Sequence, residues 1–224
     1  MRRYLRENSL GLTFGLLFLV VLVAQAFAGH ADFNQQQLTD GLEPISLGRY
    51  VTSASFGVDV LENWQSEYLQ FFLYIYLTVW LLQRGSPESK ELGKAGRESE
   101  REQKIGAFAD GSSPAWARVR GVRLWLFSNS LGLVMGVIFL LSWLGQSISG
   151  MVAYNERQLA DLEDPVSWGG YVTSPDFWNR TLQNWQSELL AVASMAILAI
   201  YLRQRGSSQS KPVGSAHTAT GIEG

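Results

Sequence analysis

Apolar residues in this chain gather in four blocks, and most of the charged residues lie between the blocks. Two blocks are long. Leu10 to Ala28 carries no charge, and Leu124 to Gly145 is similar, with Asn129 near its start. Each is close to the ~20 helical residues that cross the hydrocarbon core of a bilayer. The pattern therefore predicts transmembrane helices at about 10–28 and 124–145.

The other two blocks are shorter. Their uninterrupted apolar runs, Tyr68 to Leu82 and Leu189 to Leu202, do not span a core of ~30 Å at ~1.5 Å per residue. We therefore expect each helix to extend upstream, through a sequence Asn-Trp-Gln-Ser-Glu that occurs at both places. The predicted spans are about 63–83 and 184–203.

The sequence matches itself when it is shifted by 121 residues, from Asn8–Leu12 with Asn129–Leu133 to Gln83–Ser86 with Gln204–Ser207. Each copy is expected to be a helical hairpin. Because a copy contains two spans, both copies insert the same way up, unlike the inverted repeats of many transporters. The predicted fold is an all-α membrane protein with four transmembrane helices, arranged as two tandem parallel hairpins with a helical extracytoplasmic cap.

The cap is predicted from the segments between the spans of each hairpin. Ser174-Pro175-Asp176 has the features of a helix start, with an N-cap serine, a proline at the first position and an acid in the first turn. Its counterpart begins at Ser53. The second and fourth helices should therefore start near residues 54 and 175, and the first and third should continue through 34–38 and 155–159.

The remaining segments are rich in Gly, Ser, Lys, Arg and Glu, which is typical of solvated linkers. We expect hairpin repeats at 1–86 and 122–206, a disordered linker at 87–121 and a disordered tail at 207–224.

The distribution of positive charge predicts the topology. Fifteen of the eighteen Lys and Arg residues precede the first span, separate the second from the third, or follow the fourth. Both termini and the central linker should thus be cytoplasmic. The alternative is a signal peptide, with Ala26-Phe27-Ala28 as the cleavage site, but the apolar run exceeds the usual ~7–15 residues. We expect a retained helix.

Composition excludes several classes of function. The net charge of −2 gives no signal for nucleic acid, and the absence of cysteine excludes disulfides and thiolate sites. His30 and His217 are the only histidines, and they are not equivalent positions of the repeat. No cofactor, metal site or catalytic residue is predicted, so we do not expect an enzyme.

Small residues repeat in the first and third spans. Gly11 and Gly15 form Gly-x-x-x-Gly, and Gly132 and Gly136 repeat it. Such spacing lets helix backbones approach closely in lipid. We expect the first and third helices to cross at these glycines, and a homodimer seam is the alternative.

Polar residues near the outer ends of the spans form the candidate site. Gln25 and Gln146 lie in the first and third spans, and Glu67 and Glu188 in the second and fourth, with Asn63 and Asn184 one turn before each acid. Hydrogen bonds Gln25–Glu67 and Gln146–Glu188 would fix the register of each hairpin. The alternative is an ion or proton site, because ionisable residues inside a membrane are costly. Trp64 and Trp185 should anchor this edge in the interface.

Several stretches carry a family resemblance, among them Arg-Arg-Tyr-Leu-Arg-Glu-Asn-Ser-Leu at the start, Ala-Gln-Ala-Phe-Ala-Gly-His, Asn-Trp-Gln-Ser-Glu-Tyr-Leu-Gln and Leu-Leu-Gln-Arg-Gly-Ser. The chain resembles an uncharacterised bacterial family of four-helix membrane proteins, a domain of unknown function. The resemblance implies a bacterial plasma-membrane location and four helices, and it implies no activity. We expect an envelope scaffold or interaction protein that contacts lipid and has no nucleic-acid partner. The alternative is a small oligomeric channel or transporter that uses Glu67 and Glu188.

Overall fold

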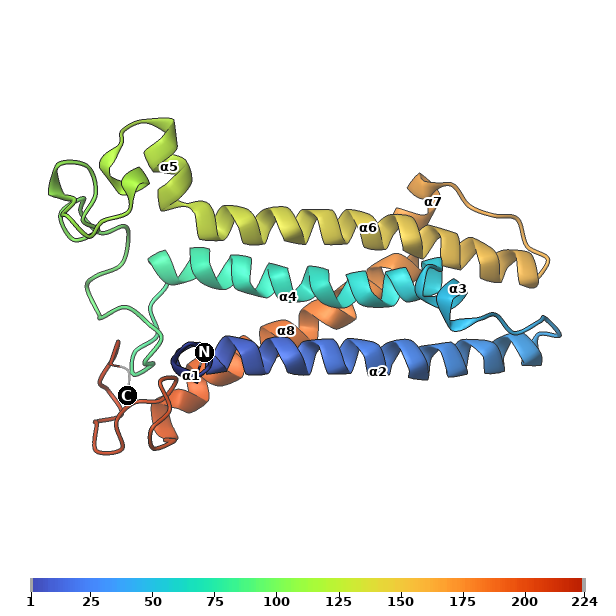
Figure 1. Cartoon of the computed structure of the whole chain (residues 1–224), viewed down its shortest axis with the longest axis horizontal. Coiled ribbons are helices and arrows are strands. Elements are labelled where there is room, and N and C mark those ends of the chain that lie inside the picture. Colours follow the sequence, from blue (N-terminus) through green and yellow to red (C-terminus); the bar gives the residue numbers. More distant parts are fainter. Residues whose placement is uncertain (1, 223–224) are drawn as a thin grey trace. The chain divides into compact units, whose positions relative to one another are not determined.

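The computed structural model describes residues 2–222 and contains only helices and irregular segments in that range, with no strands (Figure 1). The four long helices are α2 (Ser9–Thr39), α4 (Ala54–Trp80), α6 (Ser130–Ala160) and α8 (Pro175–Tyr201). The short helices are α1 (Arg2–Glu7), α3 (Leu47–Val51), α5 (Val122–Ser128) and α7 (Trp168–Val172), with 3-10 turns η1 (Gly106–Phe108) and η2 (Ala115–Arg118). The predicted all-α class is confirmed.

Two of the long helices are apolar enough to cross a membrane. These are α2 and α6, each of 31 residues. Helices α4 and α8 have 27 residues each, but they do not reach the same hydropathy because Asn, Gln and Glu occupy the middle of each helix. Hydropathy therefore supports two of the four predicted spans.

The predicted helix starts are confirmed. Helices α4 and α8 begin at Ala54 and Pro175. The hydroxyl of Ser53 accepts a hydrogen bond from the backbone N–H of Phe56, and Ser174 does the same for Phe177, both at 3.3 Å. The serine caps satisfy donors that a helix start leaves without intrahelical partners.

The third predicted helix, 124–145, is wrong at its start. A break at Asn129 separates α5 from α6, and a matching break at Asn8 separates α1 from α2. At each break the asparagine side chain donates to the carbonyl four residues earlier, Trp125 at 2.7 Å and Tyr4 at 2.8 Å. This local bond competes with continuation of the helix, which hydropathy alone does not reveal.

The structure divides into two compact units, Met1–Leu61 with Gly145–Phe177 and Glu62–Leu144 with Trp178–Gly224. In the first unit, the same pair of hydrogen bonds, which we call the clip, closes each hairpin at the end that joins its two long helices. The amide of Asn34 donates to the carbonyl of Ile45 at 3.0 Å and accepts from its N–H at 2.8 Å. Asn155 makes the same two bonds with Val166, at 2.9 and 2.8 Å. These bonds tie the loop before α3 to α2, and the loop before α7 to α6.

A buried tyrosine follows each clip. Tyr50 of α3 is 3% exposed and Tyr171 of α7 is 0% exposed. Their rings lie against Gly29 and Gly150, where a Cβ atom would collide with the phenol. Burial raises the pKa of Tyr50. The glycines thus allow α3 and α7 to sit close to the long helices.

The turn after α2 and the turn after α6 share a left-handed residue. Gly41 has φ +75°, and its equivalent in the second copy is Leu162, with φ 60° and 95% of its surface exposed. Glycine adopts this conformation without a penalty, whereas an L-residue with a Cβ loses about 1–2 kcal/mol. The second copy therefore holds a strained, exposed leucine where the first has glycine.

In the second unit, α4 packs on the glycine face of α6. A Cβ atom at Gly132 would lie 2.6 Å from the ring of Tyr76, and one at Gly136 would lie 2.9 Å from the ring of Phe72. No described atom lies within 4 Å of such an atom at Gly11 or Gly15. Aromatic rings of α4 therefore occupy the α6 glycines, and the predicted crossing of the first and third helices at paired glycines stays a prediction.

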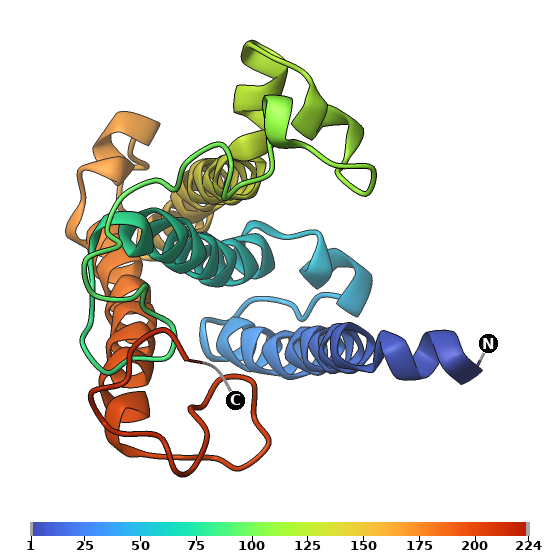
Figure 2. The same ribbon diagram turned by 90° about the vertical axis from the view of Figure 1, so that its left-hand side faces the viewer.

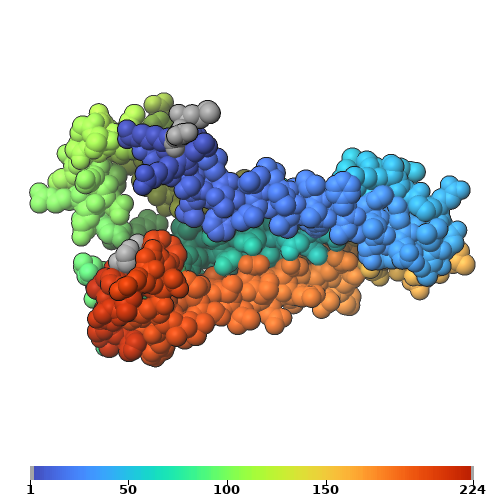
Figure 3. Space-filling view, turned by 60° about the horizontal axis from the view of Figure 1, so that its bottom comes forward, coloured from blue at the N-terminus to red at the C-terminus, as the bar shows by residue number. Residues whose placement is uncertain are grey.

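The segment after α8 folds against the start of the linker, as the C-terminal lobe in Figure 3 shows. The ammonium group of Lys211, whose residue is 1% exposed, donates to the carbonyls of Gly85 at 2.6 Å and His217 at 3.0 Å. The repeat also continues here, because Ser210 accepts from the N–H of Gln204 as Ser89 does from Gln83, both at 2.9 Å. The expected disorder of the linker and tail stays a prediction.

Candidate functional site

The two Asn-Trp-Gln-Ser-Glu segments lie on α4 and α8, which contact each other in the second unit. The indole N–H of Trp185 donates to the side-chain oxygen of Gln65 at 2.7 Å. Gln65 is 0% exposed, and its amide nitrogen donates to the carbonyl of Glu62 at 3.0 Å. The buried amide is thus satisfied by one bond within α4 and one bond to α8.

An ion pair lies beside this hydrogen bond. The guanidinium of Arg180 on α8 is 3.0 Å from the carboxylate of Glu62 on α4, and both side chains are partly buried, with 31% and 16% of their surfaces exposed. A pair removed from water needs good geometry to offset its desolvation, and loss of one partner leaves an uncompensated charge. The pair therefore specifies how α4 and α8 meet.

Aromatic residues of α6 complete the contact. Trp143 lies 5.8 Å from Trp185 and 6.1 Å from Trp178, measured between ring centroids, and Phe139 stacks on Trp143 at 5.7 Å. Trp185 of α8 thus contacts both α4 and α6 and is partly buried, and its role as an interface anchor stays a prediction. Trp64 is 38% exposed, so its anchoring role stays a prediction. We call Glu62, Gln65, Arg180 and Trp185 the α4–α8 polar cluster.

The other candidate residues of α4 and α8 surround this cluster. Glu188 is partly buried and Glu67 is exposed, and their carboxylates are close enough to interact electrostatically. The amide of Asn184 donates to the carbonyl of Arg180 at 3.0 Å, and Asn63 is exposed on α4. The structure thus brings the two acids near each other and uses Asn184 within its own helix.

The two candidate glutamines, Gln25 and Gln146, lie in the first unit. Gln146 of α6 is 0% exposed, yet neither polar atom of its amide has a hydrogen-bond partner among residues 2–222. The expected hydrogen bond from Gln146 to Glu188 stays a prediction. Gln25 of α2 is partly buried, and its bond to Glu67 stays a prediction. A buried amide without a partner costs about 1–3 kcal/mol, so Gln146 is the least satisfied polar group of the candidate set.

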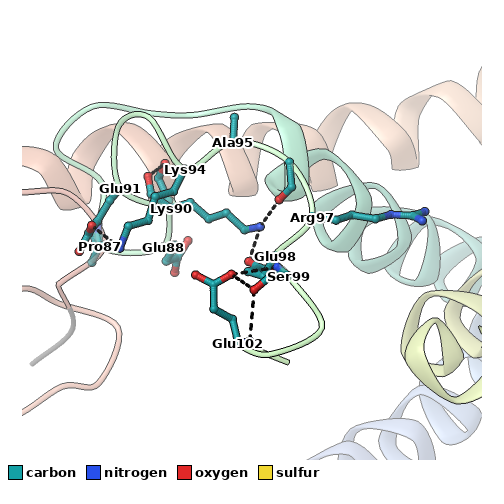
Figure 4. A pocket seen from close by; sticks show the side chains of 13 residues that line it. Pro87, Glu88, Lys90, Glu91, Lys94, Ala95, Arg97, Glu98, Ser99 and Glu102 are labelled. Atoms are coloured by element: carbon teal, nitrogen blue, oxygen red, sulfur yellow. Dashed lines mark hydrogen bonds and ion pairs between the residues drawn. The ribbon is translucent and has the colours of Figure 1, made fainter. Parts of the chain in front are cut away.

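A pocket at the linker offers a second arrangement of charges (Figure 4). Its carboxylates are already bound. Glu98 is 2.5 Å from the Lys90 ammonium, which lowers the pKa of Glu98, and Glu102 accepts from the hydroxyl and N–H of Ser99 at 2.6 and 2.9 Å. No group of three or more metal-ligating side chains occurs in the described part of the chain. The charged groups of this pocket therefore hold the linker segment that forms it, and they already have partners within the linker.

Sequence reasoning missed Gln65 and the Glu62–Arg180 pair. One signal for the pair was present, because Arg180 is one of only three cations in the acidic outer segments. The repeat obscured it: the equivalents of Glu62 and Arg180 are Gln183 and Asp59, so the pair exists only between copies. For Gln65, nothing in the sequence distinguishes it from Gln186, its exposed equivalent.

The chain belongs to a family described as a domain of unknown function, DUF6766, whose model matches residues 1–222. No curated protein and no solved structure matches the chain.

Proposed function

We propose that the protein is a multi-pass integral membrane protein with a structural, non-enzymatic role. All four long helices cross the membrane as two parallel hairpins, with α3 and α7 in an outer cap. The observation that carries the proposal is the pairing of α4 with α8 through Glu62, Gln65, Arg180 and Trp185. A contact between the two copies, built from partners that each copy lacks alone, fits a protein whose task is to hold a fixed arrangement of helices.

Helices α4 and α8 occupy equivalent positions in the two copies of the repeat. The apolar half of α4 begins at residue 68 and that of α8 at residue 189. These two positions are related by the 121-residue shift of the repeat. The polar half of α4 finds its partners on α8, where Arg180 pairs with Glu62 and Trp185 donates to Gln65. Pairing these polar groups with each other offsets the desolvation free energy of placing them at the membrane edge.

A second candidate is an ion or proton pathway. Two observations favour it: the carboxylates of Glu67 and Glu188 interact with each other, and the buried amide of Gln146 has no partner among the described residues. Carboxylates and amides are the groups that bind cations in membrane proteins. Four helices enclose little space, so this pathway requires an oligomer.

Flux measurements on Glu67→Gln plus Glu188→Gln separate the two candidates. The structural role predicts that vesicles containing the wild-type protein and vesicles containing the double variant show the same flux of protons and of monovalent cations as empty vesicles. Because each change keeps the size of the side chain, the variant should also keep the fold. A wild-type flux that the double variant abolishes would overturn the structural role in favour of the pathway.

Gln183→Glu is the matched control for that experiment. Gln183 is exposed and is the repeat equivalent of Glu62, so the variant adds a carboxylate on α8 outside the Glu67–Glu188 pair. Its flux should equal that of the wild type under either candidate.

A further inference from the structure

Helix α5 and the turns before it form a small cytoplasmic-side element with an exposed apolar face. η1, η2 and α5 fold together in the second unit, and α5 turns away from the axis of α6 (Figures 1 and 2). Val122, Trp125 and Leu126 follow the spacing i, i+3 and i+4, which places them on one side of a helix. They are 72%, 52% and 40% exposed. Trp116 of η2 adds a further exposed indole.

Two arginines accompany this face. Arg120 and Arg123 are exposed, and neither makes an ion pair with a described residue. Arg118 differs, because its guanidinium donates to the carbonyls of Asp110, Gly111 and Ser113 at 2.8–3.0 Å. Arg118 thus holds the turn together, whereas Arg120 and Arg123 remain available for an external anion. An apolar face with cations beside it is the pattern of helices that lie in a membrane interface.

The other hairpin carries the same arrangement. The equivalents of Trp125 and Leu126 are Tyr4 and Leu5 of α1, which are 64% and 51% exposed. Each pair stands just before an asparagine that breaks the helix, Asn8 or Asn129. An exposed aromatic–leucine pair at the same place in both copies, immediately before an apolar helix that can span a membrane, is explained by one shared environment. That environment is the boundary between lipid headgroups and acyl chains, where aromatic rings are enriched.

We infer that α5, with η2, lies in the cytoplasmic headgroup layer and binds anionic phospholipid through Arg120 and Arg123. Val122, Trp125 and Leu126 enter the acyl boundary, and the break at Asn129 lets α5 lie along the surface while α6 crosses the membrane. The inference rests on the proposed function, because it requires α6 to span. The partner is a lipid surface, since the apolar face continues directly into the α6 span and the flanking charges are positive.

Spin labels can test this inference in the full-length protein, because the sequence has no cysteine. A nitroxide at Val122→Cys is compared with one at Val137→Cys in α6 and one at Gln209→Cys in the tail, in nanodiscs of phosphatidylcholine with and without phosphatidylglycerol. Relative collision rates with oxygen and with a water-soluble nickel chelate report depth. We expect position 122 to lie at the headgroup boundary when phosphatidylglycerol is present, position 137 in the hydrocarbon and position 209 in water.

Arg120→Gln plus Arg123→Gln should release the label at position 122. Each arginine near an anionic surface contributes roughly fivefold to surface binding at low salt, so the two together account for on the order of twentyfold. Lys94→Gln is the control, because the Lys94 ammonium is paired with Glu91 at 2.8 Å and should not affect depth.

Two results would overturn the inference while leaving the proposed function intact. One is a label at position 122 that is as accessible to nickel as position 209 in both lipid mixtures, with position 137 in hydrocarbon. The other is a depth at position 122 that changes with neither phosphatidylglycerol nor the arginine variants. A label at position 137 that is in water contradicts the proposed function itself, and the inference with it.

Discussion

Replacing Gly132 and Gly136 by leucine is expected to lower the thermal midpoint of the detergent-solubilised protein by about 10 °C, since overpacking costs about 1–3 kcal/mol per site. The reason is the close approach of α4, whose Tyr76 and Phe72 rings would lie 2.6 and 2.9 Å from the new Cβ atoms. These rings pack on each other at 4.9 Å between centroids and cannot both move away without separating the helices. The midpoint is measured by the loss of helical circular dichroism on heating.

The matched control is Gly11→Leu plus Gly15→Leu, the equivalent change in the first copy. No described atom lies within 4 Å of a Cβ at either position, and leucine suits a lipid-facing helix. The midpoint of this variant should equal that of the wild type. Equal destabilisation by both pairs would contradict the assignment of the glycine contact to α4 and α6, and would favour a contact that both glycine pairs share.

Trp185→Phe is expected to lower the same thermal midpoint by about 5 °C, because it leaves a buried acceptor without its donor at a cost of ~1–3 kcal/mol. The acceptor is the side-chain oxygen of Gln65, which Trp185 binds at 2.7 Å. The phenyl ring retains much of the packing against Trp143 and Phe139, so the loss reports mainly the hydrogen bond.

A second change makes this prediction specific. Gln65→Leu on the Trp185→Phe background removes the unsatisfied oxygen and should recover most of the lost stability, because replacing both partners by apolar groups can be nearly neutral. Gln186→Leu, at the exposed equivalent of Gln65, should have no effect. Two results would show that the α4–α8 polar cluster does not carry the contact between the copies. One is a Trp185→Phe variant with the thermal midpoint of the wild type. The other is a double variant whose midpoint falls by more than the two single changes lower it together.

The features that could be predicted from the sequence are local. Ser53 and Ser174 specify helix starts through bonds to residues three positions away, and both were located correctly. The continuation of α2 to Thr39 and of α6 to Ala160 follows from polar stretches that favour a helix, whereas the break before α6 does not follow from hydropathy. The repeat transfers each such feature from one copy to the other, because equivalent residues have equivalent neighbours along the chain.

The features that could not be predicted depend on which helices meet. The glycine spacing indicates that something packs closely on α6, but it does not distinguish a second glycine face from the rings of Tyr76 and Phe72. In the sequence, Trp185 stands where an interface anchor would stand. Its indole N–H donates to Gln65 only because α4 approaches α8 at this point. Partner choice breaks the symmetry of the repeat, so the comparison of the two copies could not reveal it.

Asparagine has two roles in this chain that the sequence does not separate. Asn8 and Asn129 end short helices by bonding to carbonyls within them, whereas Asn34 and Asn155 bind the backbone eleven residues ahead. Both roles use the same amide group. The difference is whether a loop returns to the helix, which is a property of the folded chain.

The central claim is that four helices cross the membrane, although α2 and α6 alone have the hydropathy of spans among the helices that residues 2–222 form. Its most direct test is the labelling of single cysteines by a membrane-impermeant maleimide in intact cells, before and after permeabilisation. The positions are Glu43, Arg101, Glu163 and Gln209, which are exposed in the structure. Four spans predict that residues 43 and 163 react in intact cells and that 101 and 209 react only after permeabilisation. Reaction of 101 in intact cells, with 163 protected, is the pattern of a protein in which only α2 and α6 cross, and it would contradict the account.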